Sequence, residues 1–243
     1  MESKLIEIAK SHYENDDNYV RFVDDYKVND LLNNFDEYPH AFVLGCVMDK
    51  QIAAERAWSI PYKIYKELGK FDIDFLADVP VDEYKRLFNE GKYHRFNNQC
   101  AEFFYEAVHK IKDDYDGVAT NIWSYNLTSE EIVSRFLEFK GVGPGIATMA
   151  ANILARDFKI KMKDYSAIDI STDRHIVRVM GRLYFNDEDV SEEHVINKAR
   201  EINPEFPGLI DLACRFIGKD YCRPTDPECY NCPLNKECEY NLK

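Results

Sequence analysis

The sequence ends in a dense group of cysteines, and no other feature restricts the possible folds as strongly. Four of its seven cysteines lie in the last 22 residues, spaced as Cys222-x6-Cys229-x2-Cys232-x5-Cys238. Thiolates on so short a loop can converge on one metal centre, whereas a disulfide framework would distribute its cysteines along the chain. Four sulfurs suit either zinc or an iron-sulfur cluster. A zinc ribbon usually pairs two Cys-x2-Cys units, and only one is present here.

The remaining cysteines and the N-terminal sequence favour a reducing compartment. We expect Cys46, Cys100 and Cys214 to be buried thiols, because an odd total of seven does not suit a set of disulfides. The first five residues lack the basic start and the apolar run of a secretory signal. The longest uncharged apolar stretch, 145–155, is too short to span a bilayer. A cytoplasmic protein without membrane contact is therefore expected.

Helical spacing dominates the sequence, and we expect an all-α fold. The chain has 243 residues, enough for one large domain or two small ones, and its 45% hydrophobic content suits a packed core. Apolar residues recur at helical spacing, and no convincing strand-like alternation is present. In the helix expected after Asp173, Ile176, Val179, Met180 and Leu183 should face inward. Other helices are expected at 41–70, 96–113, 128–139 and 145–155, with an irregular charged insertion at 157–168.

A glycine-rich segment joins two of the expected helices. In Gly141-Val142-Gly143-Pro144-Gly145 the alternate glycines permit positive φ angles and the close approach of another backbone. Pro144 suits the first turn of the second helix, whose free amides, with those of the turn, would form an anion site. Such a loop can hold a DNA phosphate without contacting a base. The alternative is a plain helix-helix turn with a glycine cap.

The overall charge argues against a nucleic-acid partner, but its distribution along the chain does not. The formal net charge is -13, and overall acidity repels a polyanion. From 131 to 182, however, nine basic residues stand against six acidic ones, so this stretch is +3 and the rest is -16. An acidic surface without a nucleic-acid partner is the alternative that charge alone leaves open.

The cysteine group and the glycine-rich segment together are similar to those of a known family. The 6, 2, 5 spacing after a Gly-Val-Gly turn resembles the iron-sulfur cluster loop of the endonuclease III and adenine-mismatch glycosylase family. The likeness runs from about Gln51 to Cys238. It implies a 4Fe-4S cluster held by Cys222, Cys229, Cys232 and Cys238. It also implies a helix-hairpin-helix DNA glycosylase, a hydrolase that excises bases in base excision repair.

The resemblance also implies a domain organisation and a partner. The family's fold has two lobes, so we expect a six-helix barrel at 41–155 that includes the hairpin. The second lobe would combine 1–40 with 156–243 and carry the cluster loop 222–238. A cleft between the lobes would present the catalytic group opposite the hairpin. The expected partner is double-stranded DNA that contains a lesion or a mismatch, bound by a monomer associated with the nucleoid.

Asp173 is the expected catalytic carboxylate. The stretch from Thr172 to Val179 resembles the family's segment that carries this aspartate, 49 residues before Cys222. A carboxylate at a helix N-terminus is stabilised as the anion by the amides and the helix dipole. An anion can stabilise the positive charge that develops on the deoxyribose as the base departs, and can orient or deprotonate a water molecule. A simple N-cap role is the alternative, and Asp169 is a weaker candidate for the same task.

One departure from the family pattern bears on the reaction. Bifunctional members carry a lysine in the second hairpin helix, at the position of Gly145, and use it as a Schiff-base nucleophile that leads to strand cleavage. Glycine supplies no nucleophile, so we expect a monofunctional glycosylase without AP lyase activity. One alternative is a bifunctional enzyme in which Lys140, or an amine elsewhere in the chain, substitutes for the missing lysine. Another is a non-catalytic iron-sulfur protein that binds DNA.

The remaining DNA contacts are expected from both halves of the chain. The sequence 48–51 resembles the family's loop whose glutamine fills the gap left by the everted base, which makes Gln51 the candidate. An exposed residue without that role is the alternative. Trp58, Tyr62 or Trp123 could stack on the everted base or belong to the core. DNA would be held by Gly141, Val142, Gly143, Gly145, Arg215, Lys219 and Arg223.

Overall fold

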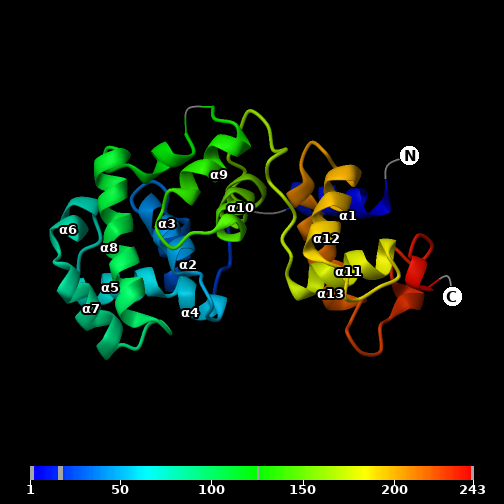
Figure 1. The fold of residues 1–243 in the computed structure, drawn as a ribbon, viewed down its shortest axis with the longest axis horizontal. Coiled ribbons are helices and arrows are strands. Elements are labelled where there is room, and N and C mark those ends of the chain that lie inside the picture. The colour runs from blue at the N-terminus through cyan, green and yellow to red at the C-terminus, as the bar shows by residue number, and fades with distance from the viewer. Residues whose placement is uncertain (1–2, 16–18, 125, 242–243) are drawn as a thin grey trace. The chain divides into compact units, whose positions relative to one another are not determined.

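The computed structural model describes residues 3–15, 19–124 and 126–241, and within these ranges all regular structure is helical (Figure 1). The all-α expectation is therefore confirmed. In the described parts of the chain, no helix combines the length and the apolar composition that crossing a bilayer requires.

The chain forms two compact units. Unit 1 comprises Met1–Asn18, Thr128–Glu130 and Ala151–Lys243, and unit 2 comprises Tyr19–Leu127 and Glu131–Ala150. Each unit contains buried apolar side chains of its own. The domain division expected from the sequence, with its barrel at 41–155, stays a prediction.

Unit 2 is built around a helix with no polar face. All ten residues of α3 (Pro39–Met48) are buried, as expected for a helix that is covered on every side. Gly45 lies against the ring of Trp58, and a Cβ there would come within 2.6 Å of the ring. The other elements are α2 (Tyr26–Asn33), α4 (Ala54–Trp58), α5 (Ile60–Leu68), α6 (Ile73–Asp78), α7 (Val81–Glu90), α8 (Asn97–Asp114), η1 (Ala119–Ile122), α9 (Ser129–Leu137) and α10 (Pro144–Asn152), the last two passing partly into unit 1.

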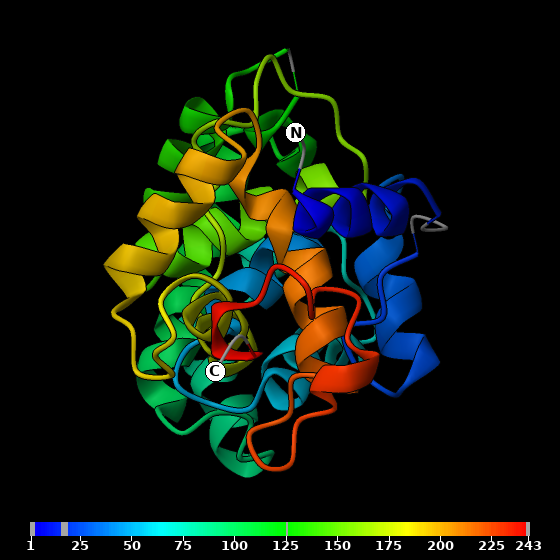
Figure 2. The ribbon, with the colours of Figure 1, turned by 90° about the vertical axis from the view of Figure 1, so that its right-hand side faces the viewer.

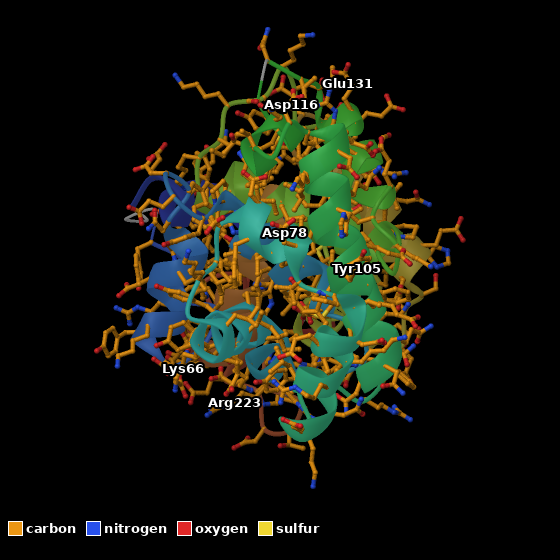
Figure 3. The ribbon with its side chains drawn as sticks, turned by 90° about the vertical axis from the view of Figure 1, so that its left-hand side faces the viewer. Lys66, Asp78, Tyr105, Asp116, Glu131 and Arg223 are labelled. Carbon is orange, nitrogen blue, oxygen red and sulfur yellow. The ribbon has the colours of Figure 1, made fainter. Side chains whose placement is uncertain are left out.

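The region 41–70 is helical, as expected, but it is divided into α3, α4 and α5 by a turn at 49–53 and by Ser59. After α3 the chain turns through Gln51, whose φ of 54° is left-handed. Pro61 stands in the first turn of α5, where its missing amide is tolerated, and Gly69 ends α5 with a φ of 73°. The expected helix at 96–113 is confirmed as α8, which packs against α6 and α7. Figure 3 shows this face of the unit, with Asp78 and Tyr105 labelled.

Unit 1 centres on two helices that pack against each other, α11 (Arg174–Tyr184) and α13 (Ile210–Asp220). α1 (Lys4–Asn15) covers α13, and α12 (Glu192–Ile202) packs on α11. In Figure 2 the C-terminal loop, in red, follows α13, in orange. The four residues expected to face inward from the helix after Asp173 are all at most 2% exposed, so this prediction is confirmed. Short turns complete the unit: η2 (Ile153–Asp157), η3 (Pro207–Leu209), η4 (Cys229–Asn231) and η5 (Glu239–Asn241).

The helices on either side of the hairpin are also confirmed, with one addition. The helices expected at 128–139 and 145–155 are α9 and α10, and α10 continues into the π-helical turn η2. This turn buries Arg156 and Asp157 beside each other. The insertion that follows is irregular, as its composition predicted. A charged pair inside a helical core needs partners of its own, and these lie in unit 1.

Candidate active site and cysteine loop

Asp173 is the N-cap of α11, as the sequence predicted. Its backbone is extended (φ -68°, ψ 163°), and its Oδ1 accepts hydrogen bonds from the amides of His175 at 2.8 Å and Ile176 at 3.0 Å. These amides belong to the first helical turn, which has no internal partners for them. Both the bonds and the helix dipole stabilise the ionised carboxylate. One oxygen is thus held by the backbone amides, and the other, Oδ2, is not bonded to them.

The second oxygen of Asp173 faces a cation. Its Oδ2 lies 3.6 Å from Nε of Arg215 on α13, and the aspartate side chain is 42% exposed. Asp169, the weaker candidate, is placed differently. Arg200 holds both of its carboxylate oxygens at 2.7 Å, and the Asp169 side chain is only 20% exposed. The geometry therefore favours Asp173 over Asp169 as the carboxylate that can meet a substrate.

The four C-terminal cysteines line one cavity in unit 1. Cys222, Cys229, Cys232 and Cys238 share its wall with apolar side chains of α11, α13 and the loop. None of these four cysteines is paired in a disulfide in the described structure. Burial raises the pKa of the Cys232 thiol, and the neighbouring cysteines add to the effect. In the described parts of the chain, however, no set of three or more His, Cys, Asp or Glu side chains is arranged to hold a metal ion.

Two buried arginines of α11 bind this loop. Arg182, with a side chain only 2% exposed, donates to the Sγ of Cys222 at 3.5 Å and to the carbonyl of Arg223 at 2.8 Å. Arg178 donates to the carbonyls of Cys222 at 2.7 Å and Gly218 at 3.0 Å. Both arginines belong to the basic stretch 131–182, and these contacts were not predicted from the sequence. Their i, i+4 spacing beside the inward face of α11 was the available signal.

The glycine-rich hairpin uses the freedom of glycine at one of its three glycines, Gly141. Gly141 has a φ of 91°, and a Cβ there would come within 2.5 Å of the Phe103 ring. Gly143 and Gly145 have open space around them. α10 begins at Pro144, so the amide of Gly145 belongs to a first helical turn. Val142 is 9% exposed and anchors the turn in unit 2.

Lys140, the alternative nucleophile, is engaged in an ion pair. Its Nζ lies 2.7 Å from Oε1 of Glu106 on α8. The hydrogen bond to Glu106 and the charge of that carboxylate raise the pKa of Lys140. A raised pKa keeps the amine protonated, and a protonated amine cannot attack a sugar carbon.

Gln51 lies exposed on a turn with a left-handed backbone, which is uncommon for a residue of this type. The turn rests on a buried histidine. His94 is 2% exposed, its Nδ1 accepts from the amide of Phe96, and its ring faces the backbone of Met48 and Lys50. Burial lowers the pKa of His94, so the ring is neutral near pH 7. A strained turn on a fixed support is typical of functional loops.

Two of the aromatic residues considered for base stacking belong to the core of unit 2. Trp58 is 3% exposed and its Nε1 donates to Oδ2 of Asp49 at 3.1 Å. Trp123 is 4% exposed and stacks on Phe136 with an interplanar angle of 3°. Neither can stack on a base without unpacking the core, because both rings are already covered. Cys46, Cys100 and Cys214 are likewise buried, as expected.

The other expected contacts with DNA divide between the units. Unit 2 contains Gln51 and the hairpin, whereas unit 1 contains Asp173, the cysteine loop and the three candidate cations. Lys219 is exposed on α13, and Arg223 forms an ion pair with Glu228. Arg215 is 49% exposed and lies beside Asp173. The cleft expected between the hairpin and Asp173 stays a prediction.

Comparison with solved structures identifies the fold. No protein-family model matches the sequence. A thermostable thymine-DNA glycosylase superposes with a TM-score of 0.60 at 16% identity, over 98% of this chain and 94% of that one. Endonuclease III in a trapped covalent complex with DNA gives 0.57 at 18% identity, over 98% and 93%. The protein has the helix-hairpin-helix DNA glycosylase fold.

The same fold recurs in a further neighbour. An 8-oxoguanine glycosylase/lyase of Clostridium acetobutylicum, solved with double-stranded DNA that has cytosine opposite 8-oxoguanine, gives a TM-score of 0.53 at 18% identity. The match covers 87% of this chain and 68% of that one. The helix-hairpin-helix glycosylase fold is thus shared over nearly the whole chain, whereas the roles of individual residues rest on the geometry above.

The hairpin geometry predicts different effects of two alanine substitutions on stability. Gly141→Ala should lower the free energy of unfolding by about 1–3 kcal/mol, because it combines a left-handed backbone with a clash against Phe103. Gly143→Ala is the matched control and should change it by no more than about 0.5 kcal/mol, since its Cβ meets open space. Urea unfolding measures both, and equal effects would contradict the role assigned to Gly141.

Proposed function

We propose that the protein is a DNA N-glycosylase that hydrolyses the bond between deoxyribose and a damaged or mismatched base. The observation that carries the proposal is Asp173, a solvent-accessible carboxylate fixed by one oxygen at a helix N-terminus, in a fold shared with DNA glycosylases. The partner would be double-stranded DNA with a lesion or a mismatch. We further propose a monomer that acts on nucleoid DNA.

The proposed reaction needs one carboxylate and one water molecule. The bond between C1′ and the base nitrogen breaks, and the base leaves with the bonding electrons. Positive charge that develops on the sugar is stabilised by the Asp173 anion. Water then bonds to C1′ as its proton passes to the carboxylate, which releases that proton to solvent, and the departing base takes up one proton from solvent. The products are a free base and an abasic site, with both DNA strands intact.

The same proposal assigns roles to the hairpin and to Gln51. A glycosidic bond inside a stacked duplex is out of reach, so the nucleotide must be everted. First-turn amides of α10 and the Gly141–Gly143 turn would hold a phosphate of the DNA backbone. Gln51 would occupy the gap in the base stack, and its exposed, strained turn supports this role. Lys219 and Arg223 would add contacts to phosphate.

We propose that the enzyme lacks AP lyase activity. Strand cleavage by this route needs an unprotonated amine that attacks C1′. Gly145 has no side chain, and Lys140 forms an ion pair with Glu106 that raises its pKa. Both observations favour direct hydrolysis by water.

A 4Fe-4S cluster is the proposed cofactor, held by the four cysteines of the C-terminal loop. Each iron of such a cluster carries its own cysteine, whereas zinc requires all four sulfurs at about 2.3 Å from one point. The four thiols line one cavity, and the single Cys-x2-Cys unit among them is unlike a zinc ribbon, which usually pairs two such units. The contact of Arg182 is compatible with zinc and with an iron-sulfur cluster, because its guanidinium donates to the Sγ of Cys222. When bound, the cluster would fix the loop and take no part in hydrolysis.

Base release tests the catalytic assignment. On single-lesion duplexes that contain uracil, thymine opposite guanine, oxidised bases or alkylated purines, the wild type should release at least one base. Asp173→Asn should reduce that release by about 100-fold or more, because the amide carries no charge and is a poor base. Asp169→Asn is the matched control and should stay close to wild type. A fully active Asp173→Asn would remove this residue from the mechanism.

Borohydride trapping on an abasic duplex tests the absence of lyase activity. The wild type should give no covalent adduct, since Gly145 supplies no amine and Lys140 is paired with Glu106. Gly145→Lys should give one, because its side chain enters open space at the start of α10, where bifunctional relatives carry their lysine. A wild-type adduct that disappears in Lys140→Gln would restore the bifunctional alternative.

Metal analysis tests the cofactor. Protein purified without oxygen should contain about four irons per chain and absorb visible light, as 4Fe-4S proteins do. Cys232→Ser should lose most of the iron. Cys100→Ser removes a buried thiol of unit 2 and should retain it. One zinc per chain in place of iron would contradict the cluster.

A further inference from the structure

Beneath Asp173 lies a row of alternating charges, all within unit 1. It runs from Asp157 through Arg156, Asp211 and Arg215 to Asp173. The first three members are buried, and the last two side chains are 49% and 42% exposed. The row therefore connects the protein interior to the proposed catalytic carboxylate. Arg156, Asp157 and Asp211 were not predicted as site residues, because no motif in the neighbouring sequence marks them.

Asp211 is the fixed point of this row. Its side chain is 2% exposed, and its Oδ1 accepts from the amide of Ser171 at 2.9 Å. Its Oδ2 accepts from Asn152 at 3.2 Å and from Arg156 at 3.2 Å. Burial raises the pKa of Asp211, and the charges of Arg156 and Arg215 act against that rise. A buried carboxylate with this many donors has little freedom to move.

Arg215 is attracted by two carboxylates at once. One turn along α13 from Asp211, its Nη2 lies 4.0 Å from Oδ2 of that buried residue. Its Nε lies 3.6 Å from Oδ2 of Asp173. Holding a mobile surface arginine in one position costs side-chain entropy. The attraction of a second carboxylate, that of buried Asp211, offsets this cost. The guanidinium is therefore directed toward Asp173 from the interior of the unit.

The contact leaves Oδ2 of Asp173 chemically available. At 3.6 Å the contact with Arg215 is longer than a hydrogen bond, so it attracts the oxygen without occupying its lone pairs. Oδ1 is already engaged by the amides of His175 and Ile176. The two sets of contacts together fix the plane of the carboxylate and determine which oxygen can meet water or the sugar.

We propose that Arg215 is a positioning residue for Asp173, anchored from below by Asp211, and that it does not serve chiefly as a phosphate contact. This inference rests on the proposed glycosylase function. It changes the role first expected for Arg215, which was to bind DNA. Its consequence is specific: loss of the guanidinium should slow base release from bound DNA, while the affinity for DNA stays nearly the same.

Two measurements on the full-length protein separate positioning from phosphate binding. The first is the single-turnover rate of base release at saturating enzyme, on a substrate that the wild type cleaves. The second is the affinity for a duplex with a tetrahydrofuran abasic-site analogue, measured across a range of salt concentrations. Arg215→Gln should slow release about tenfold, and Arg215→Lys should lose less because it keeps the charge. Affinity and its salt dependence should match wild type for both variants.

The matched control is another Arg–Asp pair of unit 1. Arg200 holds Asp169 through two hydrogen bonds on the surface, so Arg200→Gln removes the same charge from the same kind of pair. It should leave the release rate unchanged. In the background of Asp173→Asn, Arg215→Gln should cause no further loss, because its only route to the reaction is through that carboxylate. Thermal unfolding of each variant checks that the fold is retained.

The opposing outcomes are distinct. If Arg215→Gln weakens DNA binding, reduces the salt slope by about one and leaves the saturated rate unchanged, Arg215 contacts a phosphate and the inference is wrong. An unchanged rate with unchanged affinity also overturns it, as does an equal loss in the Asp173→Asn background. A wild type that releases no base from any duplex overturns the proposed function itself, and this inference with it.

Discussion

The organisation of unit 1 depends on buried positive charges along a single helix, α11. A guanidinium that leaves water needs enough acceptors to replace its hydration. Arg178 and Arg182 find theirs in backbone carbonyls of the C-terminal loop and in the Sγ of Cys222. These bonds restrict where the loop can lie, because moving it would remove acceptors from two buried guanidinium groups. The position of the cysteines is thus set by residues outside the cysteine motif.

The same helix bears the proposed catalytic carboxylate at its first turn. Asp173 accepts the amides that the helix leaves unpaired, so the bonds that begin α11 also orient the side chain. α13 supplies Arg215 on one side of this carboxylate and continues to Cys222 at its far end. The packing of α11 on α13 therefore brings the carboxylate, its arginine neighbour and the start of the cysteine loop into one rigid assembly.

In unit 2 the functional candidates occupy turns where the backbone leaves its usual range. Gly141 accepts a left-handed φ at no steric cost, and its missing side chain admits the ring of Phe103. Gln51 accepts a similar φ against its own preference, on a turn supported by buried His94. The left-handed backbone at Gly141 is explained by local packing against Phe103. The proposed role of Gln51 in filling the gap in the DNA would account for the left-handed backbone there.

The sequence alone determined the features that depend on near neighbours: the helical fold, the N-cap at Asp173, the glycine-bearing turn at 141–145 and the dense cysteine loop. Each follows from residue types within a few positions of one another. Only the tertiary structure decided which charges are surface charges. Arg156, Arg178 and Arg182 read as part of a basic stretch, yet all three are buried against distant partners. Burial depends on what packs above a residue, and that neighbour can lie 40 or more positions away in the chain.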